Sequence, residues 1–151
     1  MPPRTKRPKY PTIPLQKVVL VRDKSVEVPE HISCAWQASA IAKQLTDGSP
    51  DESIIVFCLN SDNKLVCAQI VATGAPNSVA FSPAQVFRAA IVSNATAIIV
   101  AHNHPSGVRK LSDTDLETAK LIEEAGKVLG IIVLDFILVV HNKPGCVSIH
   151  D

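Results

Sequence analysis

Hydrophobic residues recur along the chain in two patterns, one typical of strands and the other of helices. Runs of β-branched and other apolar residues between turn-forming residues predict strands. Apolar residues spaced three and four positions apart predict helices with one buried face. The predicted strands cover residues 17–21, 53–60, 65–72, 78–81, 95–101, 131–140 and 146–150. The predicted helices cover residues 35–45, 83–93 and 112–129, and this mixture indicates a single layered α/β domain.

Capping residues support the predicted helix ends. The expected N-caps of the three helices are Ser33, Ser82 and Ser112. In the second helix Pro83 occupies the first helical position and Gln85 completes a capping box. The third helix is expected to end at Gly130, because glycine readily adopts the left-handed conformation that closes a helix.

Two successive strands in the first half of the chain form a predicted hairpin around a short polar segment. If Asp62-Asn63 is the two-residue turn, Cys58 lies directly opposite Cys67. Two small buried hydrophobic side chains are the favoured interpretation of this pair in a reducing compartment, and a redox pair is the alternative.

The composition is that of a globular domain. The chain has 151 residues, of which 46% are hydrophobic and 19% charged. The N-terminus shows no signal-peptide pattern, so we expect a cytoplasmic protein. The longest apolar stretch, Gly130–Val140, is interrupted by Asp135 and is too short to span a bilayer, so no membrane partner is expected.

Residues 1–14 differ from the remainder in composition. They contain four basic residues, five prolines and no acidic residue, and the whole chain carries +1, so the remainder carries −3. Such a segment cannot build a packed core, and we predict a flexible basic arm at 1–14 followed by one domain at 15–151. The favoured interpretation is a solvated tail, and the alternative is a weak contact with a nucleic-acid backbone.

The most informative segment for chemistry is AHNHPSGVRKLSDTD, Ala101–Asp115. His102 and His104 project to the same side of an extended chain, with Cα atoms roughly 6.6 Å apart, so their imidazoles can converge on one ion. Asp115 lies in the first turn of the following helix, on the face that points inward. Two imidazoles and one carboxylate leave a fourth tetrahedral position for water, which is the pattern of a catalytic zinc site.

These residues also carry a family resemblance. His102, His104, Ser112 and Asp115 are spaced as in the JAMM motif of metalloproteases. The run AAIVSNATAIIVAHNHPSG, residues 89–107, resembles the signature of the RadC-like proteins of that superfamily. The resemblance extends from about residue 17 to the C-terminus. It implies the MPN (JAB) fold, a deaminase-like three-layer α/β sandwich with a mixed sheet and about three helices.

The resemblance implies further roles at the same site. It places zinc on the two histidines and the aspartate, and it assigns Ser112 to support of the bound water or the oxyanion, although Ser112 also has a plausible role as a helix cap. The motif requires an upstream glutamate as general acid and base. Glu52 matches by its place between the first helix and the next strand, and Glu27 and Glu30 are competitors that precede that helix.

The chain departs from the family pattern in three places. The basic arm stands where a helix-hairpin-helix region usually precedes this domain. Leu111 replaces a proline before the motif serine, and Phe136 replaces a histidine that commonly follows the Leu-Asp of the penultimate strand.

The resulting prediction is a zinc-dependent metallohydrolase that cleaves a peptide or isopeptide with a metal-activated water. The alternatives are a non-catalytic metal-binding module and a DNA-associated accessory protein that acts through the basic arm. A nucleobase deaminase is not favoured, because the H-x-E and P-C-x-x-C signature of that class is absent.

Overall fold

The computed structural model describes residues 17–18, 26–75 and 81–150. Its helices are α1 (Ala35–Leu45), α2 (Pro83–Val92) and α3 (Asp113–Leu129). Its strands are β1 (Glu52–Leu59), β2 (Leu65–Gly74), β3 (Ala97–Asn103), β4 (Ile132–Val139) and β5 (Cys146–Ser148). The predicted arm at 1–14 and most of the predicted strands at 17–21 and 78–81 lie outside the described residues.

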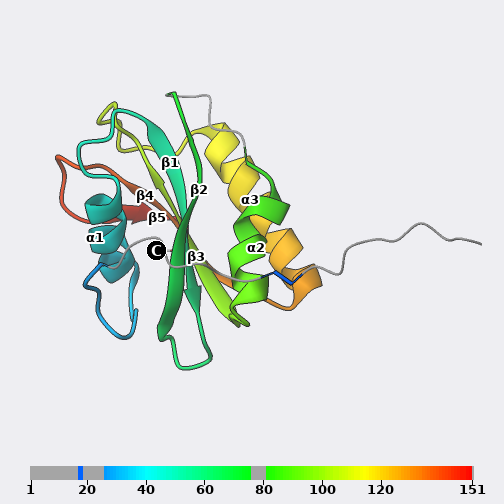
Figure 1. The fold of residues 1–151 in the computed structure, drawn as a ribbon. Coiled ribbons are helices and arrows are strands. Elements are labelled where there is room, and N and C mark those ends of the chain that lie inside the picture. Colours follow the sequence, from blue (N-terminus) through cyan, green and yellow to red (C-terminus); the bar gives the residue numbers. More distant parts are fainter. Residues whose placement is uncertain (1–16, 19–25, 76–80, 151) are drawn as a thin grey trace, which may run out of the picture.

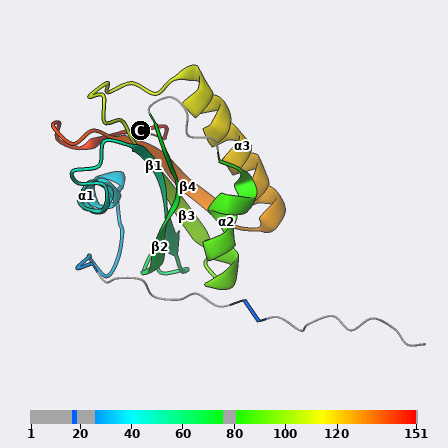
Figure 2. The same cartoon turned by 45° about the horizontal axis from the view of Figure 1, so that its top comes forward.

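The strands form one mixed sheet between two helical layers. Their order is β2-β1-β3-β4-β5, and β3 and β4 are parallel while the other neighbours are antiparallel. α1 covers one face of the sheet, and α2 and α3 cover the other (Figure 1, Figure 2). This is the predicted three-layer α/β sandwich, and the fold prediction is confirmed. Among the described residues, no helix is long and apolar enough to cross a membrane.

Two hydrophobic clusters occupy the two faces of the sheet, one against α1 and the other against α2 and α3. Every side chain of β1 and β3 is buried, because both strands lie in the interior of the sheet between helices. This double coverage explains the continuous apolar runs in both strands. β2 alternates between more and less buried positions, as expected for an edge strand.

Local signals placed two helix starts correctly and one incorrectly. Ser82 and Ser112 are N-caps with complete capping boxes, as predicted. The expected Ser33 cap is wrong, because α1 begins after Cys34, which makes no side-chain capping bond. The Ser33 backbone N–H instead donates to Gln37 Oε1 at 2.7 Å. A glutamine inside the helix therefore provides the hydrogen-bond acceptor for the residue before the N-cap.

The predicted hairpin register is confirmed at its centre. Cys58 pairs directly with Cys67 across β1 and β2, although the ladder shifts register between Cys58 and Leu59 and again between Ile54 and Ile55. Both thiols are free.

Candidate metal centre

The histidines lie at one end of the sheet, with His102 inside β3 and His104 in the loop that begins directly after it. The expectation that the strand ends at Ala101 is wrong, because β3 continues through Asn103. His102 pairs with Ile54 of β1 on one side and with Leu138 of β4 on the other. Since β1 runs antiparallel to β3, its first residue, Glu52, lies at the same end of the sheet.

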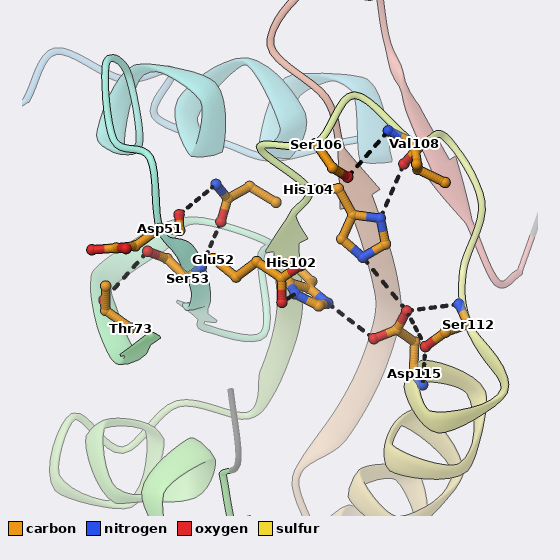
Figure 3. A network of polar contacts seen from close by, with 11 residues as sticks. Asp51, Glu52, Ser53, Thr73, His102, His104, Ser106, Val108, Ser112 and Asp115 are labelled. Atoms are coloured by element: carbon orange, nitrogen blue, oxygen red, sulfur yellow. Dashed lines mark hydrogen bonds and ion pairs between the residues drawn. The ribbon is translucent and has the colours of Figure 1, made fainter. Parts of the chain in front are cut away.

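Asp115 completes the cluster from the first turn of α3. Its Oδ1 lies 3.1 Å from His102 Nδ1, and its Oδ2 lies 3.6 Å from His104 Nε2. Glu52 approaches the other ring nitrogen of His102, with 3.4 Å between Oε2 and Nε2. Figure 3 shows the two carboxylates on either side of His102. Glu52, His102 and Asp115 are at most 9% exposed, so the cluster is largely shielded from water.

A metal ion can be held here by side chains of the described residues. One ligand atom from each of Glu52, His102 and His104 lies within 4.8 Å of the other two. The sequence proposed Asp115 as the third ligand, and the structure brings both carboxylates to the histidines. The buried Nε2 of His102 makes no regular hydrogen bond among the described residues, although Glu52 Oε2 lies 3.4 Å away. A metal ion would give this nitrogen a partner.

Ser112 holds the Asp115 carboxylate in place. Its backbone N–H and its hydroxyl both donate to Asp115 Oδ2, at 2.7 and 2.8 Å. Burial would raise the pKa of this carboxyl, but the hydrogen bonds from Ser112 and the two nearby imidazoles hold the pKa below its ordinary value. Asp115 is therefore ionised at neutral pH.

The surroundings of His102 favour the neutral form of its imidazole. Burial lowers the pKa of His102, and the neighbouring His104 lowers it further, while Asp115 and Glu52 act against this shift. The neutral ring is the form that binds metals. A neutral imidazole next to an ionised carboxylate is the donor set that zinc prefers.

The profile of the RadC-like JAB domain family matches residues 32–151, which include every residue of this cluster. The chain belongs to this family. Its relatives include a UPF0758 protein of Carboxydothermus hydrogenoformans, 40% identical over 92 residues, or 61% of this chain and 41% of the relative. A UPF0758 protein of Methanospirillum hungatei is 36% identical over 115 residues, which cover 76% of this chain and 49% of that protein. The matched part thus spans less than half of each of these relatives.

In this RadC-like domain the loop after β3 fixes the second histidine. His104 Nδ1 lies 3.0 Å from the backbone oxygen of Val108. With Nδ1 as the donor of this bond, Nε2 keeps its lone pair and faces Asp115. The loop turns at Gly107, whose φ of 80° is a conformation that residues with a Cβ rarely adopt.

Asn103 was missed by the sequence reasoning, although it stands between the two histidines. It is fully buried, its Oδ1 accepts from the Ser53 backbone N–H at 2.6 Å, and its Nδ2 donates to the Asp51 backbone oxygen at 3.2 Å. These bonds hold the main chain on both sides of Glu52. The alternation of side chains along a strand could have indicated its role. The residue between two histidines that share one side of the strand points to the opposite side, and a buried polar side chain there needs a hydrogen-bond partner of its own.

The competing glutamates lie elsewhere on the domain. Glu30 is exposed and forms an ion pair of 2.6 Å with Lys64 at the β1–β2 turn, at the opposite end of β1 from Glu52. Glu27 is exposed as well. Of the three glutamates, Glu52 is the one that lies beside His102.

An open cleft of about 390 Å³ adjoins the cluster. It is formed by the loops that precede β1 and follow β3 and β4, and His104 is part of its wall. It thus lies at the C-terminal ends of the parallel strands β3 and β4, where open α/β sheets commonly bind ligands. His141, on the wall of the cleft, is fixed by a contact of 2.9 Å between its Nε2 and Thr46 Oγ1.

Proposed function

We propose that this domain is a zinc-dependent hydrolase that cleaves an amide bond of a peptide or isopeptide. The observation that carries this proposal is the convergence of two histidines and two carboxylates in one buried cluster beside an open cleft. In this proposal His102, His104 and Asp115 hold the zinc, and Glu52 is the general acid and base. Membership of the RadC-like JAB family supports the same assignment.

The distances support Asp115 as the third ligand. Atoms that bind a tetrahedral zinc at roughly 2.1 Å lie about 3.4 Å from one another. Asp115 Oδ2 lies 3.6 Å from His104 Nε2, which matches this spacing. Oδ1 lies 3.1 Å from Nδ1 of His102 and thereby leaves Nε2 of that ring for the metal. Asp115 is also the carboxylate that α3 holds ionised and in one orientation.

The proposed chemistry divides between the metal and the chain. When bound, zinc would lower the pKa of a water molecule to about 7 and polarise the substrate carbonyl. Glu52 would accept the proton of the attacking water and return it to the leaving amine. Ser112 would keep the Asp115 carboxylate aimed at both histidines through its two hydrogen bonds.

Zinc content and hydrolysis of a peptide and isopeptide panel together test this proposal. The wild-type chain should hold about one zinc ion, and His104→Ala should hold none. His150→Ala is the matched control, because His150 pairs with Glu123 of α3 away from the cluster, and it should bind zinc as the wild type does. A His104→Ala chain that retains zinc would disprove the ligand set.

Glu52→Gln separates the general base from a ligand. The amide nearly matches the carboxylate in shape but cannot accept the proton, so zinc should remain while hydrolysis falls by about 10²–10⁴-fold. Loss of zinc in this variant would instead make Glu52 a ligand, an arrangement that the close group of Glu52, His102 and His104 also allows. A wild-type chain that binds zinc but cleaves no amide would make the domain a non-catalytic metal-binding module.

A further inference from the structure

We propose that Cys58 and Cys67 form a covalent modification site, at which peroxide converts the two thiols into a reversible disulfide between β1 and β2. This inference does not depend on the proposed hydrolase function. It concerns a pair of side chains that the metal centre does not use.

The register brings the two cysteines together. They are direct partners in the antiparallel ladder, and both side chains pack on the face of the sheet that α2 and α3 cover. Directly opposite Cβ atoms in such a ladder lie roughly 4.5–5.5 Å apart, and a disulfide requires about 3.5–4.5 Å. The two Cβ atoms therefore need to move only slightly closer for a disulfide to form. The ladder already shifts register next to Cys58, so the backbone there departs from regular pairing.

The surroundings give the two thiols different roles. A hydrogen bond from Cys58 lowers the pKa of the Cys67 thiol to about 7, against the effect of burial, and Ser93 lowers it as well. The same contact with Cys67, together with burial, raises the pKa of Cys58. The proposal therefore assigns the negative charge to Cys67 and the proton to Cys58. Cys58 is fully buried, whereas Cys67 is half-buried, so the nucleophilic sulfur is also the more accessible one.

The reaction balances in two steps. The Cys67 thiolate attacks one oxygen of hydrogen peroxide, the O–O bond breaks, and Cys67 becomes a sulfenic acid while hydroxide takes up a proton to form water. The Cys58 sulfur then attacks the Cys67 sulfur, the S–S bond forms, and the S–O bond breaks. The Cys58 proton leaves with the hydroxyl group as a second water molecule. Two electrons pass from the thiols to the peroxide, and a small thiol such as glutathione returns them.

Thiol labelling after peroxide treatment of the full chain tests the proposal. We expect hydrogen peroxide to remove two alkylatable thiols, a peptide linking Cys58 to Cys67 to appear on mass spectrometry, and dithiothreitol to restore both thiols. The double variant Cys34→Ser with Cys146→Ser is the matched control, and it should form the same link. After oxidation the chain is unfolded and its remaining thiols are alkylated. The proposal is wrong if Cys58 and Cys67 are both alkylated and only Cys34 or Cys146 has been oxidised.

A second variant tests the division of roles. Cys58→Ala keeps the site apolar and removes both the hydrogen-bond donor and the resolving thiol. Oxidation of Cys67 should then stop at a sulfenic acid that dimedone captures, and it should be about tenfold slower at neutral pH because the thiolate is less favoured. Equal oxidation rates in wild type and Cys58→Ala would contradict the proposed activation of Cys67 by Cys58.

Discussion

His102 is contacted through both of its ring nitrogens by carboxylates that come from different elements. Asp115 approaches Nδ1 from α3, and Glu52 approaches Nε2 from β1. The imidazole is nevertheless held toward its neutral form, because burial lowers its pKa more than the two carboxylates raise it. The cluster therefore combines a neutral donor with an ionised one, and this combination makes the metal-free protein sensitive to acid.

Acid should destabilise the metal-free protein. The pKa of His102 lies below its ordinary value of 6.5, so the unfolded chain binds a proton before the folded one does as the pH falls below that value. The pKa of Asp115 is also lowered, which adds a further loss of stability below its ordinary value of 3.8. The free energy of unfolding should therefore fall between about pH 7 and about pH 5. Urea unfolding of the metal-free wild type measures this, and His102→Gln should show a smaller change.

Replacement of Asn103 should lower both stability and hydrolysis without removing any metal ligand. Asn103→Ala leaves the Ser53 N–H and the Asp51 carbonyl without their side-chain partner. The free energy of unfolding should fall by about 2–4 kcal/mol. Hydrolysis should fall in addition, because the main chain on both sides of Glu52 is released, while zinc content should stay unchanged.

Asn60→Ala is the control for this variant. The Asn60 side chain accepts from the Asp62 and Lys64 backbone N–H groups, both at 3.0 Å, just beyond the far end of β1. Comparison at a temperature where both variants are folded separates lost stability from lost positioning. If Asn103→Ala hydrolyses substrate as fast as Asn60→Ala, Asn103 does not position the general base.

At the scale of elements, α3 links the core to the metal centre. Its N-terminal capping pair, Ser112 and Asp115, is also part of the site. Its other end packs closely on the start of β4, where the Ile131 N–H donates to the Gly126 backbone oxygen at 3.0 Å. The position of α3 is thus set by contacts at both ends.

Gly126→Ala should destabilise the domain, although alanine is the better helix former. The added Cβ would lie 2.6 Å from the Ile131 backbone oxygen and 2.9 Å from Val133 Cγ2. Overpacking of this kind costs about 1–3 kcal/mol, which exceeds the gain in helix propensity of roughly 1 kcal/mol. Chemical unfolding should show a lower free energy of unfolding than in the wild type. Glu124→Ala, at an exposed position of the same helix, is the control, and its free energy of unfolding should stay within about 0.5 kcal/mol of the wild-type value. A Gly126→Ala variant more stable than the wild type would disprove the close approach.

At the scale of the whole molecule, the charge is divided unevenly along the chain. Residues 1–14 carry four positive charges, and the remaining residues carry −3. Any attraction to nucleic acid should therefore come from the arm, while the folded domain should repel phosphate.

Deletion of residues 1–14 should leave folding and zinc content unchanged. The segment has five prolines and few large apolar residues, so its burial would gain too little to offset an ordering cost of roughly 1–2 kcal/mol per residue. Any duplex DNA binding by the full chain should have a log–log salt slope no steeper than about −3.6, and the deletion should abolish that binding. A truncated chain that binds DNA with the same slope would place the contact on the domain, and one that fails to fold would show that the segment is docked.

The sequence alone predicted the features that depend on near neighbours. The Ser82 and Ser112 capping boxes and the end of α3 at Gly130 arise from residues within a few positions of one another, so composition and spacing were sufficient to find them. The Cys58–Cys67 pairing followed from the expectation of a tight turn between two neighbouring strands.

The features that sequence reasoning missed depend on distant parts of the chain. β3 continues through Asn103 because strands on both sides supply partners for its backbone. The role of Asn103 could not be read from spacing, since its partners Asp51 and Ser53 lie about fifty positions away and meet it only after β1 and β3 have paired. Such hydrogen bonds form only once the strands have packed into the sheet. Burial then excludes water, so each polar group must bond to another part of the chain.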